Sequence, residues 1–154
     1  MTYHELQPEV AGGWGAHTQA DTSCHPPIVS RLHYEFDGWL GDCLLESFPC
    51  FIATESVIAA LADGGMTGFE VSDVEISLTQ EFRGQYPDRD VGHWRWLRPT
   101  ASPGEADIAV SKSCVLVVSA RALQVFKAHG LFNCTIQDHK GEQAGGCDGE
   151  EPPS

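Results

Sequence analysis

The sequence predicts an α+β fold: two related β-α-β units whose short helices pack on one face of a mixed or mainly antiparallel sheet. The first observation is an internal repeat. When the chain is shifted against itself so that Thr54 meets Ser119, LVVSARALQVFKAHGLFNCTI lies beneath FIATESVIAALADGGMTGFEV. Matching apolar, capping and glycine positions are typical of a duplicated supersecondary unit. The second observation is the alternation of apolar and polar residues in IVSRLHYEF, which has the period of a half-buried strand.

The first repeated unit contains a strand in CLLESFPCFIAT, which should begin after Pro49. Thr54 is a suitable N-cap for a helix near 55–63, because its hydroxyl can accept a hydrogen bond from a free N–H of the first turn. Gly64 or Gly65 should adopt the left-handed conformation that ends the helix. Three apolar residues should form the buried face: Val57, Ile58 and Leu61. FEVSDVEISLTQEF should follow as one strand, or as two joined at Ser72 and Asp73.

The second unit follows the same pattern after the polar stretch TASPGEAD. Ser119 caps a predicted helix near 120–129, and Gly130 ends it. Three residues should form its buried face: Ala122, Leu123 and Phe126. Before this unit, RGQYPDRDVG is predicted to be a loop and HWRWLRP a strand that ends at Pro99.

Residues 1–139 are predicted to form a single globular domain, because a chain of 154 residues with 42% hydrophobic content suits one core. Residues 1–27 are expected to be loosely ordered, with TYHEL as a possible edge strand. Residues 140–154 have no apolar periodicity, which predicts a disordered acidic tail. We find neither an apolar run long enough to span a membrane nor the pattern of a secretory signal, so a cytoplasmic protein without membrane contact is expected.

The six cysteines are predicted to be reduced thiols. Cys50, Cys114 and Cys134 lie in or beside apolar strand-like runs, where a free thiol behaves as a small hydrophobic group. The alternative is a zinc site formed by cysteines and histidines. The spacings match no standard zinc finger or ribbon, so no structural metal and no cofactor are expected.

The charge distribution favours a basic partner. The formal net charge is -13, and no Lys or Arg occurs between Arg31 and Arg83. This stretch carries ten carboxylates: Glu35, Asp37, Asp42, Glu46, Glu55, Asp63, Glu70, Asp73, Glu75 and Glu81. Such an acidic surface disfavours direct binding of nucleic acid. HWRWLRP combines aromatic and basic residues that could stack bases, but in this chain we expect its indole rings to be buried.

The glycine-rich turn DGWLGD is the candidate functional site. Asp37, Asp42 and Glu46 could lie around Trp39, and a tryptophan surrounded by polar residues is typical of an interface hot spot. Crowded carboxylates could instead perform acid-base chemistry or bind a cation. A third interpretation is purely structural, with the aspartates bonded to local backbone. No catalytic signature occurs, so no catalytic residue is assigned.

LHYEFDGWLGDCLLESFPCFIATESVIAALADGGMTGFEVSDVEIS, WLRP and LVVSARALQVFKAHGLFNCTI together resemble a group of uncharacterised bacterial proteins related to immunity proteins of polymorphic toxin systems. The resemblance covers most of residues 28–138. It implies a binding protein without catalytic residues, and it identifies no binding position.

The expected function is therefore that of an immunity-type protein, which neutralises a cognate toxin through its acidic face. A basic nuclease would be a suitable toxin. The alternative is a small enzyme or ligand-binding protein with an acidic cleft around Asp37, Asp42 and Glu46, near Tyr34 or His33. An inhibitor should present a broad acidic patch, whereas an enzyme needs an enclosed pocket with perturbed titratable groups.

Overall fold

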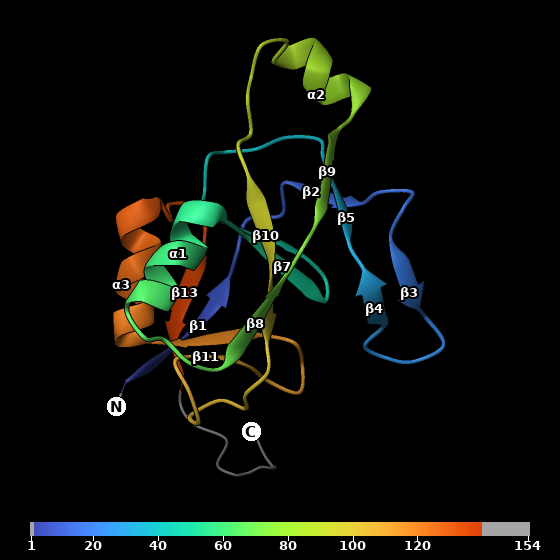
Figure 1. Cartoon of the computed structure of the whole chain (residues 1–154). Helices are drawn as coiled ribbons and strands as arrows, with labels where there is room; N and C mark the ends of the chain where they lie inside the picture. Colours follow the sequence, from blue (N-terminus) through green and yellow to red (C-terminus); the bar gives the residue numbers. More distant parts are fainter. Residues whose placement is uncertain (1, 140–154) are drawn as a thin grey trace.

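A computed structural model describes residues 2–139 of the chain and confirms the α+β fold (Figure 1). The predicted tail, 140–154, lies outside the described residues. The elements are, in order, β1 (Tyr3–Gln7), β2 (Gly12–Trp14), β3 (Gln19–Asp21), β4 (Ile28–Arg31), β5 (His33–Phe36), β6 (Leu44–Ser47), β7 (Cys50–Thr54), α1 (Glu55–Asp63), β8 (Phe69–Ser72), β9 (Glu75–Leu78), α2 (Gln80–Gln85), β10 (Trp94–Pro99), β11 (Ile108–Val110), β12 (Leu116–Ser119), α3 (Ala120–His129) and β13 (Thr135–Asp138).

Two four-stranded antiparallel sheets share one strand pattern. Their orders are β6-β7-β10-β8 and β11-β12-β1-β13. Each sheet begins with a hairpin, β6–β7 or β11–β12, and a helix follows the hairpin in the chain. The strand after the helix, β8 or β13, lies at the opposite edge of the sheet. Between the hairpin and this edge strand lies a strand from another part of the chain. The central strand of the first sheet is β10, which directly precedes the second hairpin, and that of the second sheet is β1. The two repeats have therefore exchanged their central strands.

The register supports this relationship. Leu97 in β10 is opposite Phe51 and Val71, whereas Leu6 in β1 is opposite Leu116 and Ile136. The repeat offset that pairs Thr54 with Ser119 also pairs Phe51 with Leu116 and Val71 with Ile136. The duplication found in the sequence is thus matched strand by strand.

The two helices begin and end as predicted. The Thr54 hydroxyl accepts a hydrogen bond from the Val57 N–H at the start of α1, and Ser119 accepts one from the Ala122 N–H at the start of α3. Gly65 and Gly130 follow the helices with φ of +69° and +108°. L-residues other than glycine are strained in this region, so the glycines permit the turn into the next strand.

The main core lies between the paired helices and the two sheets. Helices α1 and α3 pack side by side (Figure 1). Leu61 and Phe126, which the repeat predicted to be equivalent, are both fully buried in this one core. Leu6 and Leu97 from the exchanged central strands belong to it as well.

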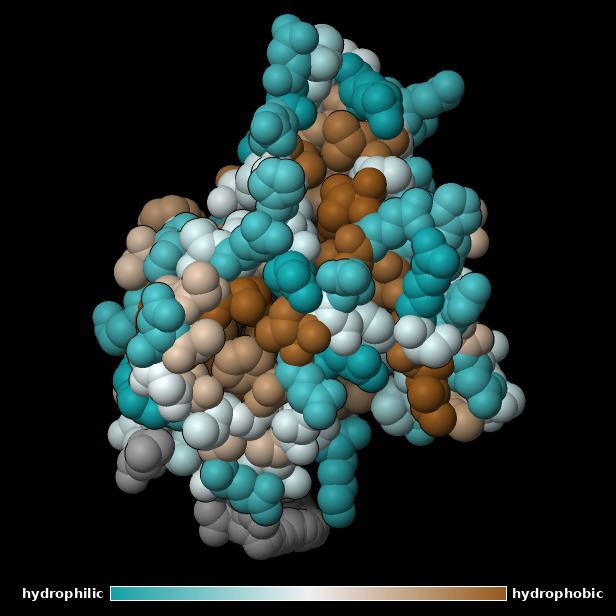
Figure 2. Space-filling model, viewed as in Figure 1, coloured by the Kyte–Doolittle hydropathy of each residue, from teal (hydrophilic) through white to brown (hydrophobic). Residues whose placement is uncertain are grey.

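The segments between the repeated elements form a second, aromatic core. Strands β2, β5 and β9 form a three-stranded sheet in which β5 and β9 are parallel, and β3 pairs with β4. Tyr34, Phe36, Phe82 and Trp94 pack together there. Figure 2 shows hydrophobic side chains in an interrupted band that runs from α2 over the middle of the molecule, with polar side chains on either side.

Several details differ from the sequence predictions. IVSRLHYEF, predicted to be one strand, forms β4 and β5, which belong to different sheets. The structure has two four-stranded sheets where one was expected, and a third strand separates the two strands of each β-α-β unit. Strand β1 lies inside a sheet, where an edge strand or little order was predicted, because its backbone pairs with β12 and β13. The helix α2 occupies residues assigned to a strand and a loop, since Thr79 caps it and Phe82 anchors it in the second core.

Candidate functional site

The predicted centre at Trp39 is a packed structural element. The Trp39 indole N–H donates to the main-chain oxygen of Asp42 at 3.0 Å, and the ring packs edge-on against Phe36 and Trp94. The Arg89 guanidinium lies 4.6 Å from the ring centroid and donates to the Trp39 carbonyl oxygen. Asp37 is exposed beside this turn. Trp39 is half-buried, and the Arg89 guanidinium of the same chain lies over its ring.

Asp42 does not present its carboxylate to solvent, which corrects its assignment to the binding surface. The residue is fully buried. Its oxygens accept hydrogen bonds from the main-chain N–H groups of Phe132 at 3.0 Å and Asn133 at 2.8 Å, and from the Asn133 side-chain amide at 3.0 Å. Asp42 therefore fixes the loop after α3. Its role is structural, but its partners are distant in the sequence and not the local backbone of the turn.

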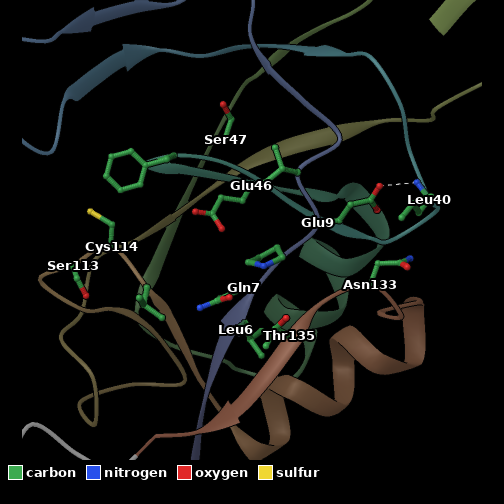
Figure 3. Close-up of a pocket in the computed structure, with 14 residues that line it drawn as sticks. Leu6, Gln7, Glu9, Leu40, Glu46, Ser47, Ser113, Cys114, Asn133 and Thr135 are labelled. Carbon is green, nitrogen blue, oxygen red and sulfur yellow. Dashed lines mark hydrogen bonds between the residues drawn. The ribbon is translucent and has the colours of Figure 1, made fainter.

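Glu46 lies in a different place, on the wall of an open pocket of about 740 Å³. The side chain is half-buried, and it forms no hydrogen bond or ion pair with the residues that the structure describes. Burial raises the pKa of this carboxyl group. Figure 3 shows the Glu46 carboxylate directed into the pocket on the side of Cys114. The three predicted carboxylates thus do not converge, because only Glu46 faces the pocket.

The pocket forms where the two repeats meet. Its walls come from the end of β1, the hairpin β6–β7, the turn between β11 and β12 and the start of β13 (Figure 3). Its residues are Leu6, Gln7, Pro8, Glu9, Val10, Leu40, Glu46, Ser47, Phe48, Ser113, Cys114, Val115, Asn133 and Thr135. We call this the Glu46 pocket.

A second cleft has the corresponding position in the other half of the molecule. It is bordered by the end of β10 and the turn between β6 and β7, and it measures about 300 Å³. The N–H of Glu46 donates to the Glu9 carbonyl oxygen, and that of Val110 donates to the Ala101 carbonyl oxygen, which makes Val110 the counterpart of Glu46. Residues 27–29, which include the start of β4, line this second cleft. Only the first repeat therefore places a carboxylate in its cleft.

The rim of the Glu46 pocket is apolar and exposed. Val10, Leu40 and Phe48 line it with 67%, 72% and 46% of their surface accessible. Phe132, beside the lining residue Asn133, is 83% exposed. Single exposed apolar residues are common, but several around one concave site are typical of a binding surface. We call these four residues the apolar rim.

Glu9 positions part of this rim, a role that no pattern in the sequence indicates. The carboxylate is nearly buried and accepts a hydrogen bond from the Leu40 N–H at 2.6 Å, shown as the dashed line in Figure 3. Burial raises the pKa of Glu9, although main-chain hydrogen bonds from Leu40 and Asp42 oppose the shift. Glu9 therefore holds Leu40 at the mouth of the pocket.

The remaining candidate nucleophiles and acids are poorly placed for catalysis. Burial raises the pKa of the Cys114 thiol, so it is protonated at neutral pH and is a weak nucleophile. Tyr34 is fully buried, and its hydroxyl bridges the Ala11 N–H and the Glu46 carbonyl oxygen. The five cysteines in the described part of the chain are free thiols. Burial raises the pKa of Cys43, Cys50 and Cys134 to about 12.

Strand β10, which carries the predicted aromatic and basic residues, also has a structural role. Trp94 and Trp96 are buried, as predicted. The Arg98 guanidinium lies 4.4 Å from the centroid of the Trp96 ring, and Arg95 pairs with Asp73. These indoles are thus not free to stack bases.

One group of potential metal ligands occurs among the described residues, formed by His17, His33 and Glu75. It lies outside the Glu46 pocket.

Comparison with protein-family models and with curated proteins found no match to this chain. Within residues 2–139, none of the helices has the length and apolar character that crossing a membrane requires.

Proposed function

We propose that this chain is a non-catalytic binding protein of the immunity type, which neutralises a cognate toxin by receiving one of its basic side chains in the Glu46 pocket. The observation that carries the proposal is the Glu46 carboxylate, half-buried in an open pocket and without a cationic partner among the described residues. A cytoplasmic location belongs to the same proposal.

The carboxylate supplies the polar part of the recognition. Burial raises its pKa, which means that the charged form is poorly solvated. A lysine or arginine of a partner would form a charge-assisted hydrogen bond with it and would compensate for this lost solvation. The acidic stretch from residue 32 to 82 would increase the rate of encounter with a basic protein such as a nuclease.

The apolar rim supplies the rest of the contact. Val10, Leu40 and Phe48 surround the pocket, so a partner that inserts a basic side chain also buries them. Interface hot spots combine such apolar contacts with one enclosed charged group. The pocket contains no His, Lys or Arg among its lining residues, which disfavours acid-base catalysis by this site and favours binding.

The test uses the product of the gene adjacent to the one that encodes this chain. We expect the two purified proteins to form a complex, and we expect Glu46→Gln to accelerate dissociation by about tenfold or more, as loss of a partly buried ion pair does. Leu40→Ser should also accelerate dissociation. Asp88→Asn removes the same charge at an exposed loop position and is the matched control. Thermal melts would establish that each variant folds.

Failure of the two proteins to associate would reject the immunity function with this partner. A complex that Glu46→Gln leaves unchanged would reject the pocket as its centre. If the pocket instead binds a small amine more tightly than the protein partner, the alternative of a ligand-binding protein replaces the proposal.

A further inference from the structure

His17, His33 and Glu75 come from three separate segments and meet at one point. His33 and Glu75 are opposite each other in the parallel pair β5–β9, and His17 belongs to the loop between β2 and β3. One ligand atom from each residue lies within 4.8 Å of the other two. The Nδ1 atom of His17 is 2.8 Å from Oε2 of Glu75.

We propose that these three residues form a zinc-binding site that fastens the loop between β2 and β3 to the sheet. Two imidazole nitrogens and one carboxylate oxygen are a common ligand set for Zn²⁺, with a water molecule as the fourth ligand. The sequence predicted no structural metal because its cysteines and histidines match no standard zinc-site spacing. These ligands are distant in the sequence.

His33 is oriented as a metal ligand requires. Its Nδ1 accepts a hydrogen bond from the His17 main-chain N–H at 3.1 Å, so its Nε2 carries the proton. This Nε2 lies 2.7 Å from the Ser77 hydroxyl, which in turn donates to Glu35. A histidine ligand usually donates its second N–H to such a partner, which fixes the ring and increases its basicity. The unprotonated Nδ1 therefore faces His17.

The position of the His33 ring is also fixed sterically. The ring is buried, and a Cβ atom at Gly15 would overlap it. The Gly15 N–H donates to the His33 carbonyl oxygen at 2.7 Å, and Thr18 bonds both main-chain groups of His33. The loop thus already rests on His33. Binding a metal requires that the His17 main-chain N–H leave Nδ1 of His33 and that the His17 ring nitrogen facing Glu75 be unprotonated. His17 lies at the surface, where both changes can occur.

Glu75 has one oxygen available for a cation. Its Oε1 pairs with the Arg31 guanidinium at 3.2 Å, whereas Oε2 faces His17. Arg31 orients the carboxylate but also repels a dication. Because the Arg31 side chain is 57% exposed, it can turn into solvent when the metal binds. A surface depression lined by His17, Thr18 and Arg31 provides access from solvent.

The experiment is a calorimetric titration of chelator-treated, dialysed full-length protein with zinc chloride. We expect one saturable site per chain and a rise in the melting temperature with zinc, because a ligand that binds only the folded state stabilises it. His17→Ala and Glu75→Gln should each weaken binding at least tenfold and abolish the thermal shift. Neither change removes a buried side chain, so both variants should fold. Cys24→Ser and His25→Ala are the controls, since both side chains are exposed nearby in the sequence.

Cobalt(II) gives an independent measurement of the ligands. Bound at this site it should show d–d absorption without a thiolate charge-transfer band, because no cysteine is a ligand. The proposal is overturned if the wild-type protein has no saturable zinc site, if His17→Ala binds zinc as the wild type does, or if Cys24→Ser alone abolishes binding.

Discussion

Asp42 and Asp107 have the same role in the two repeats, and each fixes the loop that follows the helix of the other repeat. Asp42 accepts hydrogen bonds from the main chain of Phe132 and Asn133, after α3. Asp107 accepts one from the Thr67 main chain, after α1, at 3.1 Å. The repeat offset that pairs Thr54 with Ser119 also pairs Asp42 with Asp107 and Thr67 with Phe132 in the sequence. In the strand register Asp107 matches Cys43, because the carbonyl oxygens of these two residues accept hydrogen bonds from the N–H groups of Ser119 and Thr54. Asp42 thus reaches the loop from one residue earlier. The carboxylates thus fasten the repeats to each other, as the exchanged strands do.

Asp107 has additional partners. The Ser119 hydroxyl donates to it at 2.7 Å, and the Arg121 guanidinium donates through two nitrogens at 2.9 Å each. Asp107 therefore links the N-cap of α3 to the loop after α1. The two aspartates differ in one respect: among residues 2–139, Asp107 is paired with a cation and Asp42 is not.

The first prediction concerns both aspartates. Asp42→Ala and Asp107→Ala should each reduce the free energy of unfolding by roughly 3 kcal/mol, because buried N–H groups lose their charged acceptors. Asp37→Ala, at an exposed position close in sequence, should change it by less than about 0.5 kcal/mol. Urea denaturation measures all three. A small loss of stability in Asp42→Ala would mean that water replaces the carboxylate as acceptor for the N–H groups of the loop after α3. Asp42 would then again be a candidate for partner binding.

The second prediction is a pH dependence of folding. The Arg121 guanidinium holds the pKa of Asp107 well below its ordinary value of 3.8. The unfolded state therefore binds this proton at a higher pH than the folded state does. The contribution of Asp107 to stability is complete above the ordinary value and is lost as the pH falls toward the folded value.

Asp107→Asn should abolish this contribution. Its melting temperature should consequently decline less than that of the wild type when the pH is lowered from 5 to 2 (about the interval in which an unfolded aspartate gains its proton). Equal declines in the two proteins would show that other carboxylates determine the acid unfolding.

The repeat could be predicted because its signals are local. Thr54 and Ser119 each accept a hydrogen bond from an N–H group only three residues later in the chain, and Leu61 and Phe126 follow at helical spacing. The same shift of the sequence also aligns Asp42 with Asp107, so their shared role could have been inferred from it. It was missed because the stretch around Asp107 is polar and has the composition of a loop.

The exchange of central strands could not be predicted from these signals. Strands β1 and β10 lie outside the matched window, and their pairing partners are distant in sequence. One trace is the pattern of Leu and Pro two residues apart, which Leu6-Gln7-Pro8 shares with Leu97-Arg98-Pro99. The separation of Asp42 from Glu46 has a similar cause, because the sequence does not show that the loop after α3 is the partner of Asp42.

The third prediction concerns the equivalent core residues. Leu61→Ala and Phe126→Ala should each cost roughly 2 to 5 kcal/mol, through lost burial and the cavity that remains. Both side chains are fully buried in one core, so the losses should be similar. Guanidinium unfolding of both variants provides the comparison. A loss below about 1 kcal/mol at either site would contradict the equivalence.

The fourth prediction concerns the N-terminal strand. Because β1 separates β12 from β13, deletion of residues 1–7 should abolish cooperative thermal unfolding. An edge strand or a loosely ordered segment could be removed without this loss. His4→Ala retains the backbone of β1 and should melt cooperatively. Circular dichroism melts distinguish these outcomes, and a cooperative transition in the truncated protein would contradict the central position of β1.

The last prediction separates the Glu46 pocket from an ordinary structural site. Since burial raises the pKa of Glu46, the folded state holds this proton to a higher pH than the unfolded state. Ionisation of Glu46 thus lowers stability as the pH rises from its unfolded value through its folded value. Glu46→Gln removes that cost and should raise the melting temperature at pH 7 by up to about 3 °C, with no gain at pH 4. Asp88→Asn should show no such dependence. A variant that is less stable at pH 7 would reveal a stabilising partner for Glu46 within the chain and would contradict a carboxylate held for an external cation.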